Sequence, residues 1–174
     1  MWLRAVEAYQ SAAQRANSDE KSLSCLLAAA QLTEKKLDEA DEALGLYRRA
    51  LERAYGAVKT AYDHGEVPGK DSTLLSERNV AWASAERLLR AGKDLREVDA
   101  LLVERLAHTP SAAIDDRVSL LEQRRDLLLA LHEKRKDPGE LPSALIATIQ
   151  ELARLKPRDD LMLSKQQTLA QSLS

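Results

Sequence analysis

The stretch that decides the expected fold is NVAWASAERLLRAGKDLREVDALLVERLAHTP, residues 79–110. Apolar residues recur at spacings of three and four in both halves, which places them on one face of a helix. Between the halves, Gly92 is expected to take the left-handed conformation that ends a helix, and Asp94 to cap the next helix. Pro110 closes the second half, because proline cannot continue a helix. The stretch therefore predicts two antiparallel helices joined by a short turn.

The order of these residues resembles a tetratricopeptide (TPR) repeat, which closes with a proline about 34 residues on. The matching residues are Trp82, Gly92-Lys93-Asp94-Leu95, Glu97-Val98, Leu102 and Pro110. Glu86 and Arg105 depart from the pattern, because they stand where the family prefers small residues. The resemblance implies a right-handed superhelix of stacked antiparallel helix hairpins, in which Trp82, Leu102 and Pro110 are structural. An irregular helical bundle is the alternative fold, also all-α.

Helical spacing continues towards the N-terminus. Residues 2–16 predict a short helix, with Ser18 or Asp19 capping the next one. Residues 21–64 contain no Gly-Pro break and leave two interpretations open, a single long helix or a hairpin. The hairpin, turning near 35–38 with Asp38 as a cap, is favoured because helices much longer than about 25 residues are uncommon in compact domains.

Further helices are expected towards the C-terminus. His64 to Ser72 is a loop, because Gly65, Pro68 and Gly69 interrupt the helical pattern. Ser111 is expected to cap a helix that ends at 134–139. A helix is expected at 141–155. A last helix, capped by Asp159 or Asp160, is expected at 161–173. The chain therefore predicts one all-helical domain, 1–174, of seven or eight helices, with residues 79–110 as its best repeat unit. It would also fit a piece of a longer protein.

Composition excludes several classes of protein. Hydrophobic residues make up 44% of the chain and aromatic residues 3%, with no Phe, which suits packed helices better than a sheet. A net charge of −2 gives no basic field for nucleic acid. No segment is apolar enough to insert into a membrane. The single cysteine, Cys25, excludes an internal disulfide and is expected to be a small buried hydrophobe.

Residues that resemble catalytic or ligand sites are explained better as helix termini. The loop 65–72 contains glycines, a Lys and a Ser, but lacks the spacing and the preceding strand of a phosphate-binding loop. The aspartate pairs 115–116 and 159–160 open helices, where acidic residues interact favourably with the helix dipole. No two histidines have the spacing of a helical metal pair. The three histidines are His64, His108 and His132. We expect no enzyme activity, no cofactor and no metal.

Arginines are the best candidates for a binding surface. If residues 79–91 and 112–134 are the first helices of two consecutive hairpins, their arginines line one concave face. Guanidinium groups pair with carboxylates in bidentate fashion, so such a face would hold an acidic peptide or helix. The alternative is that these arginines pair with acids on their own helices, namely Glu86, Asp116, Glu122 and Asp126. The candidate partner-binding residues are Arg87, Arg90, Arg117, Arg124 and Arg125.

A scaffold of this kind suits a non-enzymatic protein–protein interaction module that holds a partner peptide or helix on its concave face. Two alternatives remain open: a self-associating structural bundle, which would form a homodimer, and a small-ligand or enzyme-associated helical domain. The expected location is the cytoplasm, or the periplasm or elsewhere if the chain is an excised domain.

Overall fold

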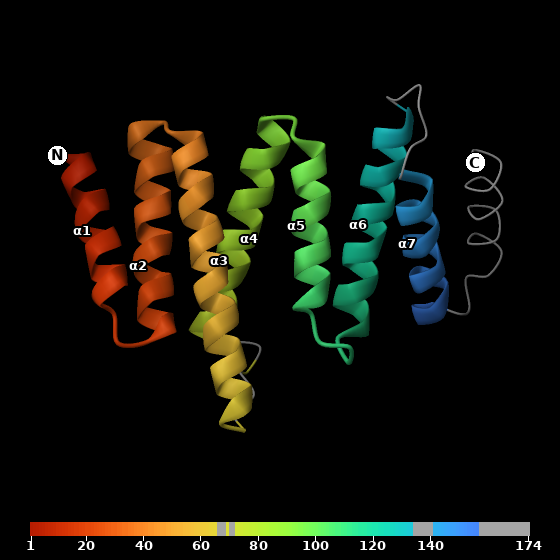
Figure 1. Ribbon diagram of the computed structural model, residues 1–174, viewed down its shortest axis with the longest axis horizontal. Helices are drawn as coiled ribbons and strands as arrows, with labels where there is room; N and C mark the ends of the chain where they lie inside the picture. Colours follow the sequence, from red (N-terminus) through yellow and green to blue (C-terminus); the bar gives the residue numbers. More distant parts are fainter. Residues whose placement is uncertain (66–68, 70–71, 134–140, 157–174) are drawn as a thin grey trace. The chain divides into compact units, whose positions relative to one another are not determined.

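The computed structural model describes residues 1–65, 69, 72–133 and 141–156 (Figure 1). Within these ranges the chain forms seven α-helices and one π-helical turn, and no strand. The expected all-α class is therefore confirmed for the described part of the chain. The chain divides into two compact units, Met1–Lys93 and Asp94–Ser174. The boundary falls in the turn of the predicted repeat unit 79–110, so that its two helices belong to different units.

Unit 1 is a row of antiparallel helices in which α2 packs against α1, α3 and α4, and α3 packs against α4. Helix α1 therefore lies at one edge of unit 1, with α2 between it and α3 (Figure 1). Each helix buries one apolar side, as the spacing of the sequence predicts. The elements are α1 (Trp2–Arg15), α2 (Asp19–Leu32), the π-helical turn η1 (Thr33–Leu37), α3 (Ala40–Asp63) and α4 (Thr73–Ala91).

The long helical pattern of 21–64 is a hairpin, which confirms the favoured interpretation. Helix α2 widens into η1, and the chain reverses at Asp38, whose φ of 58° is left-handed. The prediction of Asp38 as the cap of the following helix is wrong, because α3 begins only at Ala40. Asp38 instead ends the preceding turn, and its N–H donates to the Thr33 carbonyl. Aspartate tolerates this conformation better than most residues.

Helix ends in unit 1 follow the sequence signals in part. Ser18 caps α2 as expected, since its hydroxyl accepts the Lys21 N–H at 3.3 Å. Helix α4 begins at Thr73, earlier than the expected start of 79, after the cap Ser72. The prediction of a left-handed Gly92 is wrong. Gly92 is right-handed, with φ −72°, because its N–H still bonds back to the Leu88 carbonyl, and the chain reverses one residue later at Lys93, with φ 59°.

The core of unit 1 lies between α2, α3 and α4. Trp82 of α4 is 2% exposed, and its ring centroid lies 5.9 Å from that of Tyr55 in α3. The residue after Tyr55, Gly56, allows Asp19 of α2 to approach closely, because a Cβ there would lie 2.7 Å from Asp19 Oδ2. The packing of α3 against α4 thus involves an aromatic pair, and its close approach to α2 depends on the absence of a side chain at Gly56.

Unit 2 contains α5 (Leu95–Ala107), α6 (Ile114–Glu133) and α7 (Leu141–Leu155), with α6 packed against both others. Asp94 caps α5 as expected, through the Glu97 N–H at 3.2 Å. The prediction of Ser111 as a cap is wrong. The Ala113 N–H bonds to the Pro110 carbonyl at 3.0 Å, so Ser111 lies inside a turn and α6 begins only at Ile114. The core residues include Leu102, Leu121, Leu128 and Ile149.

Three sequence predictions fall wholly or largely on residues outside the described ranges. These are the loop between His64 and Ser72, the helix end at 134–139, and the last helix, 161–173, with the paired aspartates 159–160 before it. The described part of the chain contains no helix that is long and apolar enough to cross a membrane.

Candidate functional site

The five predicted arginines all form ion pairs inside their own units. In unit 1, Arg87 of α4 pairs with Glu34 of η1, and Arg90 pairs with Glu86 one turn away at 2.7 Å. The Arg87 guanidinium is thereby joined to a carboxylate 53 residues earlier in the chain. These two side chains stay about half exposed. A partner's carboxylate would have to compete with the acids that already hold them.

In unit 2, Arg124 and Arg117 of α6 act as links between helices. Arg124 forks onto both Asp99 carboxylate oxygens, at 2.7 Å and 3.3 Å, and so ties α6 to α5. Arg117 donates to the carbonyls of Leu106 and Thr109, each at 3.1 Å, and to Glu151 Oε1 of α7 at 2.5 Å. Such forked, charge-assisted bonds are among the stronger polar contacts in proteins. Both arginines therefore stabilise the packing of unit 2.

Arg125 pairs with its neighbour Asp126 at 2.7 Å, as the alternative interpretation of these arginines expects for residues on one helix. The three arginines of α6 have side chains that are only 18% to 20% exposed. The other predicted structural residues differ among themselves: Trp82 and Leu102 are buried, whereas Pro110 is exposed in the turn after α5.

A partly buried polar network joins three elements of unit 1. The Tyr47 hydroxyl of α3 donates to Glu34 Oε2 at 2.8 Å, and Arg87 of α4 donates to the other oxygen of the same carboxylate. Burial raises the pKa of Tyr47 to about 12; the Glu34 carboxylate acts in the same direction, and a hydrogen bond with Ser84 acts against it. The network fixes η1 against α3 and α4, and the phenol stays protonated.

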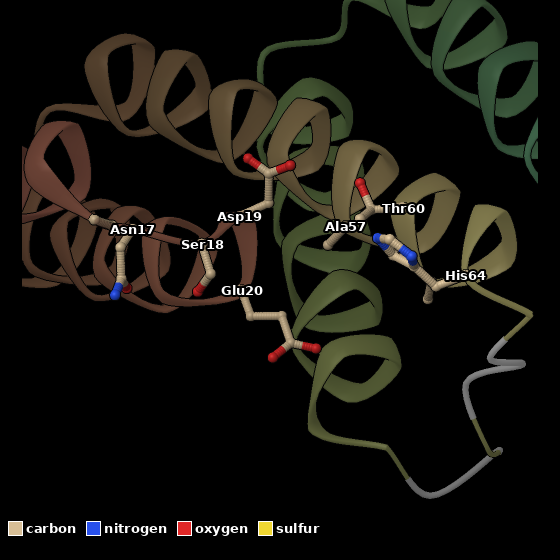
Figure 2. Close-up of a pocket in the computed structure, with 9 residues that line it drawn as sticks. Asn17, Ser18, Asp19, Glu20, Ala57, Thr60 and His64 are labelled. Carbon is tan, nitrogen blue, oxygen red and sulfur yellow. The ribbon is translucent and has the colours of Figure 1, made fainter.

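A pocket of about 510 Å³ opens beside the turn between α1 and α2 (Figure 2). Figure 2 shows Asp19 directed towards α3 and Glu20 directed away from it. Thr60 lies in the last turn of α3, and His64 directly follows the helix. Asp19 pairs with Arg53 at 3.5 Å, and the Ser18 hydroxyl is engaged as the helix cap. Two of the polar side chains of this wall, Ser18 and Asp19, are therefore already engaged, Ser18 in capping α2 and Asp19 in linking α2 to α3.

The described residues contain no group of three or more His, Cys, Asp or Glu side chains that could hold a metal ion. His64, His108 and His132 lie at or just beyond the C-terminal ends of α3, α5 and α6, as their spacing predicts. Asp115 and Asp116 lie in the first turn of α6, where the helix dipole favours them. Cys25 is half-buried, less covered than the sequence predicts.

The surface that sequence reasoning missed is the side of α1 that α2 leaves open. Trp2, Ala5, Tyr9 and Ala12 follow one another at spacings of three, four and three, so they share one side of the helix; we call them the α1 face. Trp2 is 43% exposed and Tyr9 40% exposed. On the helix they lie next to Val6 and Ala13, which are buried. The 3–4 spacing was visible in the sequence, but which apolar side is covered was not.

Cations border the α1 face. Arg15 lies along its edge, one turn beyond Ala12, and Lys36 Nζ lies 5.4 Å from the Trp2 ring centroid at its N-terminal end, whereas Arg4 lies further round the helix, one turn before Glu7. A cation at that distance is attracted by the ring face. Within the described ranges, neither Arg4 nor Arg15 takes part in an ion pair. They differ in this from the five arginines singled out in the sequence.

Comparisons of the chain with protein-family models, with curated proteins and with solved structures found no match.

Proposed function

We propose that this chain is a non-enzymatic protein–protein interaction module that docks its partner on the α1 face. The observation that carries the proposal is the exposure of Trp2 and Tyr9 together on one side of α1. They are two of only six aromatic residues in the chain, and the buried Tyr47 and Trp82 show that the fold can cover such rings. Tryptophan and tyrosine are the residues that most often dominate the energy of protein interfaces.

Helix packing within unit 1 supports the same proposal. Within the described part of the chain, α2 packs against α1, α3 and α4, whereas α1 packs only against α2 and η1. An additional helix laid along α1 would therefore cover apolar surface in the way that α2 already does on its other side. The ion-paired arginines offer a weaker surface, because a partner would first have to separate each guanidinium from its own carboxylate.

A photo-crosslinking amino acid at position 9 tests this proposal directly. The protein carrying it is irradiated in an extract of its source cells, and a sister protein with the same group at Val80 serves as the control. Val80 of α4 is also 40% exposed but lies on another helix. We expect a defined cross-linked protein from position 9 that is absent from position 80. The product should disappear when Trp2→Ser is added.

Three other results would contradict the proposal. Equal cross-linking from positions 9 and 80 would indicate unspecific collisions, and no product from position 9 would mean that the α1 face stays uncovered. A product that contains only this chain would favour the self-associating structural bundle.

A further inference from the structure

We infer that the α1 face is built for an amphipathic helix whose apolar stripe is bordered by acidic side chains. This inference rests on the proposed function and names the partner that the face fits. Three observations carry it: the spacing of the apolar residues on α1, the cations along their edge, and the place of the single acid of α1.

The apolar spacing fits a helix rather than an extended peptide. From Trp2 to Ala12 the α1 face repeats aromatic, alanine, aromatic, alanine at spacings of three, four and three. This is the seam pattern of paired helices, in which large side chains of one helix insert between residues of the other. The alanines leave room between Trp2 and Tyr9 for the partner's side chains. The seam is about 15 Å long, so it holds about three turns of a partner helix.

The charges around the seam select an acidic partner. Arg15 and Lys36 border the α1 face, and no carboxylate in the described ranges forms an ion pair with Arg15. Glu7 is the single acid of α1. Helical spacing puts it on the side opposite the α1 face, next to Leu3, Arg4 and Gln10. Cationic rims attract complementary charges and reject like ones, so acids beside the partner's stripe would fix its register.

The same charges disfavour a second copy of this chain. Two α1 helices paired head to tail would bring Arg15 of one copy near Lys36 beside Trp2 of the other, and a parallel pair would bring Arg15 of both copies together. Both arrangements place like charges along the seam. A membrane surface fits less well than a helix, since two of the four seam residues are alanines, which bury little apolar area.

The test uses two synthetic helical peptides of about three heptads. Both carry leucines at the seam positions; one has Glu and the other has Lys at every flanking position. Binding of each labelled peptide to the full chain is measured by fluorescence anisotropy at low and at high salt. We expect the Glu peptide to bind at least about tenfold more tightly than the Lys peptide, and to lose affinity as salt rises.

Variants of the chain locate the binding. Arg15→Glu with Lys36→Glu should reverse the preference between the two peptides. Arg49→Glu with Lys59→Glu is the matched control, because both are exposed cations of α3 and make the same charge change away from α1. Trp2→Ser with Tyr9→Ser should abolish binding of the Glu peptide. Circular dichroism checks that each variant stays helical, which we expect because all the replaced side chains are exposed.

Several outcomes would overturn the inference. Equal affinity for both peptides, or an unchanged preference in the variant Arg15→Glu with Lys36→Glu, would rule out the acidic partner while leaving the cross-linking result of the proposed function intact. Dimers in sedimentation that Trp2→Ser with Tyr9→Ser abolishes would assign the face to a second copy. Co-sedimentation with vesicles of phosphatidylcholine and phosphatidylserine, lost in the same variant while neither peptide binds, would assign it to a membrane surface.

Discussion

Two glycines of α3 allow a matched test of how α2 and α3 pack. Gly45 and Gly56 both lie inside the helix, where glycine is about 1 kcal/mol less favourable than alanine. At Gly45 a new Cβ would meet no atom within 4 Å. Gly45→Ala should therefore stabilise the protein by about 1 kcal/mol.

Gly56→Ala should not give this gain. Its Cβ would lie 2.7 Å from Asp19 Oδ2 and 3.4 Å from Asp19 Cγ, closer than the roughly 3.5–4.0 Å at which carbon contacts are favourable. Asp19 would have to move away from Arg53, 3.5 Å distant, and from its place in the first turn of α2. These interactions contribute roughly 0.3–1 kcal/mol each. Gly56→Ala should thus be neutral or destabilising by about 1 kcal/mol.

The assay is urea unfolding followed by tryptophan fluorescence. Both tryptophans, Trp2 and Trp82, belong to unit 1, so the signal reports the unit that contains both glycines. The Asp19→Ala background completes a double-mutant cycle: without the carboxylate, Gly56→Ala should become stabilising by about 1 kcal/mol. Equal effects at Gly45 and Gly56, or a Gly56→Ala effect that does not depend on Asp19, would refute the proposed close approach of α2 to α3.

Three further substitutions test single features of the fold. Lys93→Gly should raise the free energy of unfolding by about 0.5–1 kcal/mol, because Lys93 has a φ of 59° that glycine adopts without strain; a lower stability in urea unfolding would contradict this. Thr33→Val should leave stability equal or raise it by about 1 kcal/mol, since the buried Thr33 hydroxyl has no hydrogen-bond partner; a loss of that size in the same assay would mean that it has one. Tyr47→Phe should cost about 1–2 kcal/mol at neutral pH through the lost bond to Glu34. Because folding raises the pKa of Tyr47 from 10.0 to about 12, its contribution is complete below pH 10 and is lost as the pH rises towards 12, so the wild type should lose stability in that window more steeply than Tyr47→Phe does. Parallel curves of unfolding free energy against pH would refute this assignment.

Local chemistry predicted the helices well and their ends less well. The hairpin in 21–64 and the caps Ser18 and Asp94 were readable from spacing and capping residues alone. The exact residues at which the chain reverses could not be predicted in this way, because a helix continues for as long as backbone hydrogen bonds remain available. For this reason Lys93 rather than Gly92 is left-handed, and α6 begins after Ser111.

The sequence by itself determined that the described part of this protein is all-α, because apolar residues at spacings of three and four, with few aromatics, have no other way to bury one face. It also placed Trp2, Ala5, Tyr9 and Ala12 on one side of a helix. Only the tertiary structure decided which apolar sides are covered by other helices and which cations form ion pairs. Arg87 meets Glu34 across 53 residues of chain, whereas Arg4 and Arg15 meet no acid in the described ranges. Helical spacing fixes direction around one axis, but pairing and exposure depend on the neighbouring helices, and those are positioned by packing between distant parts of the chain.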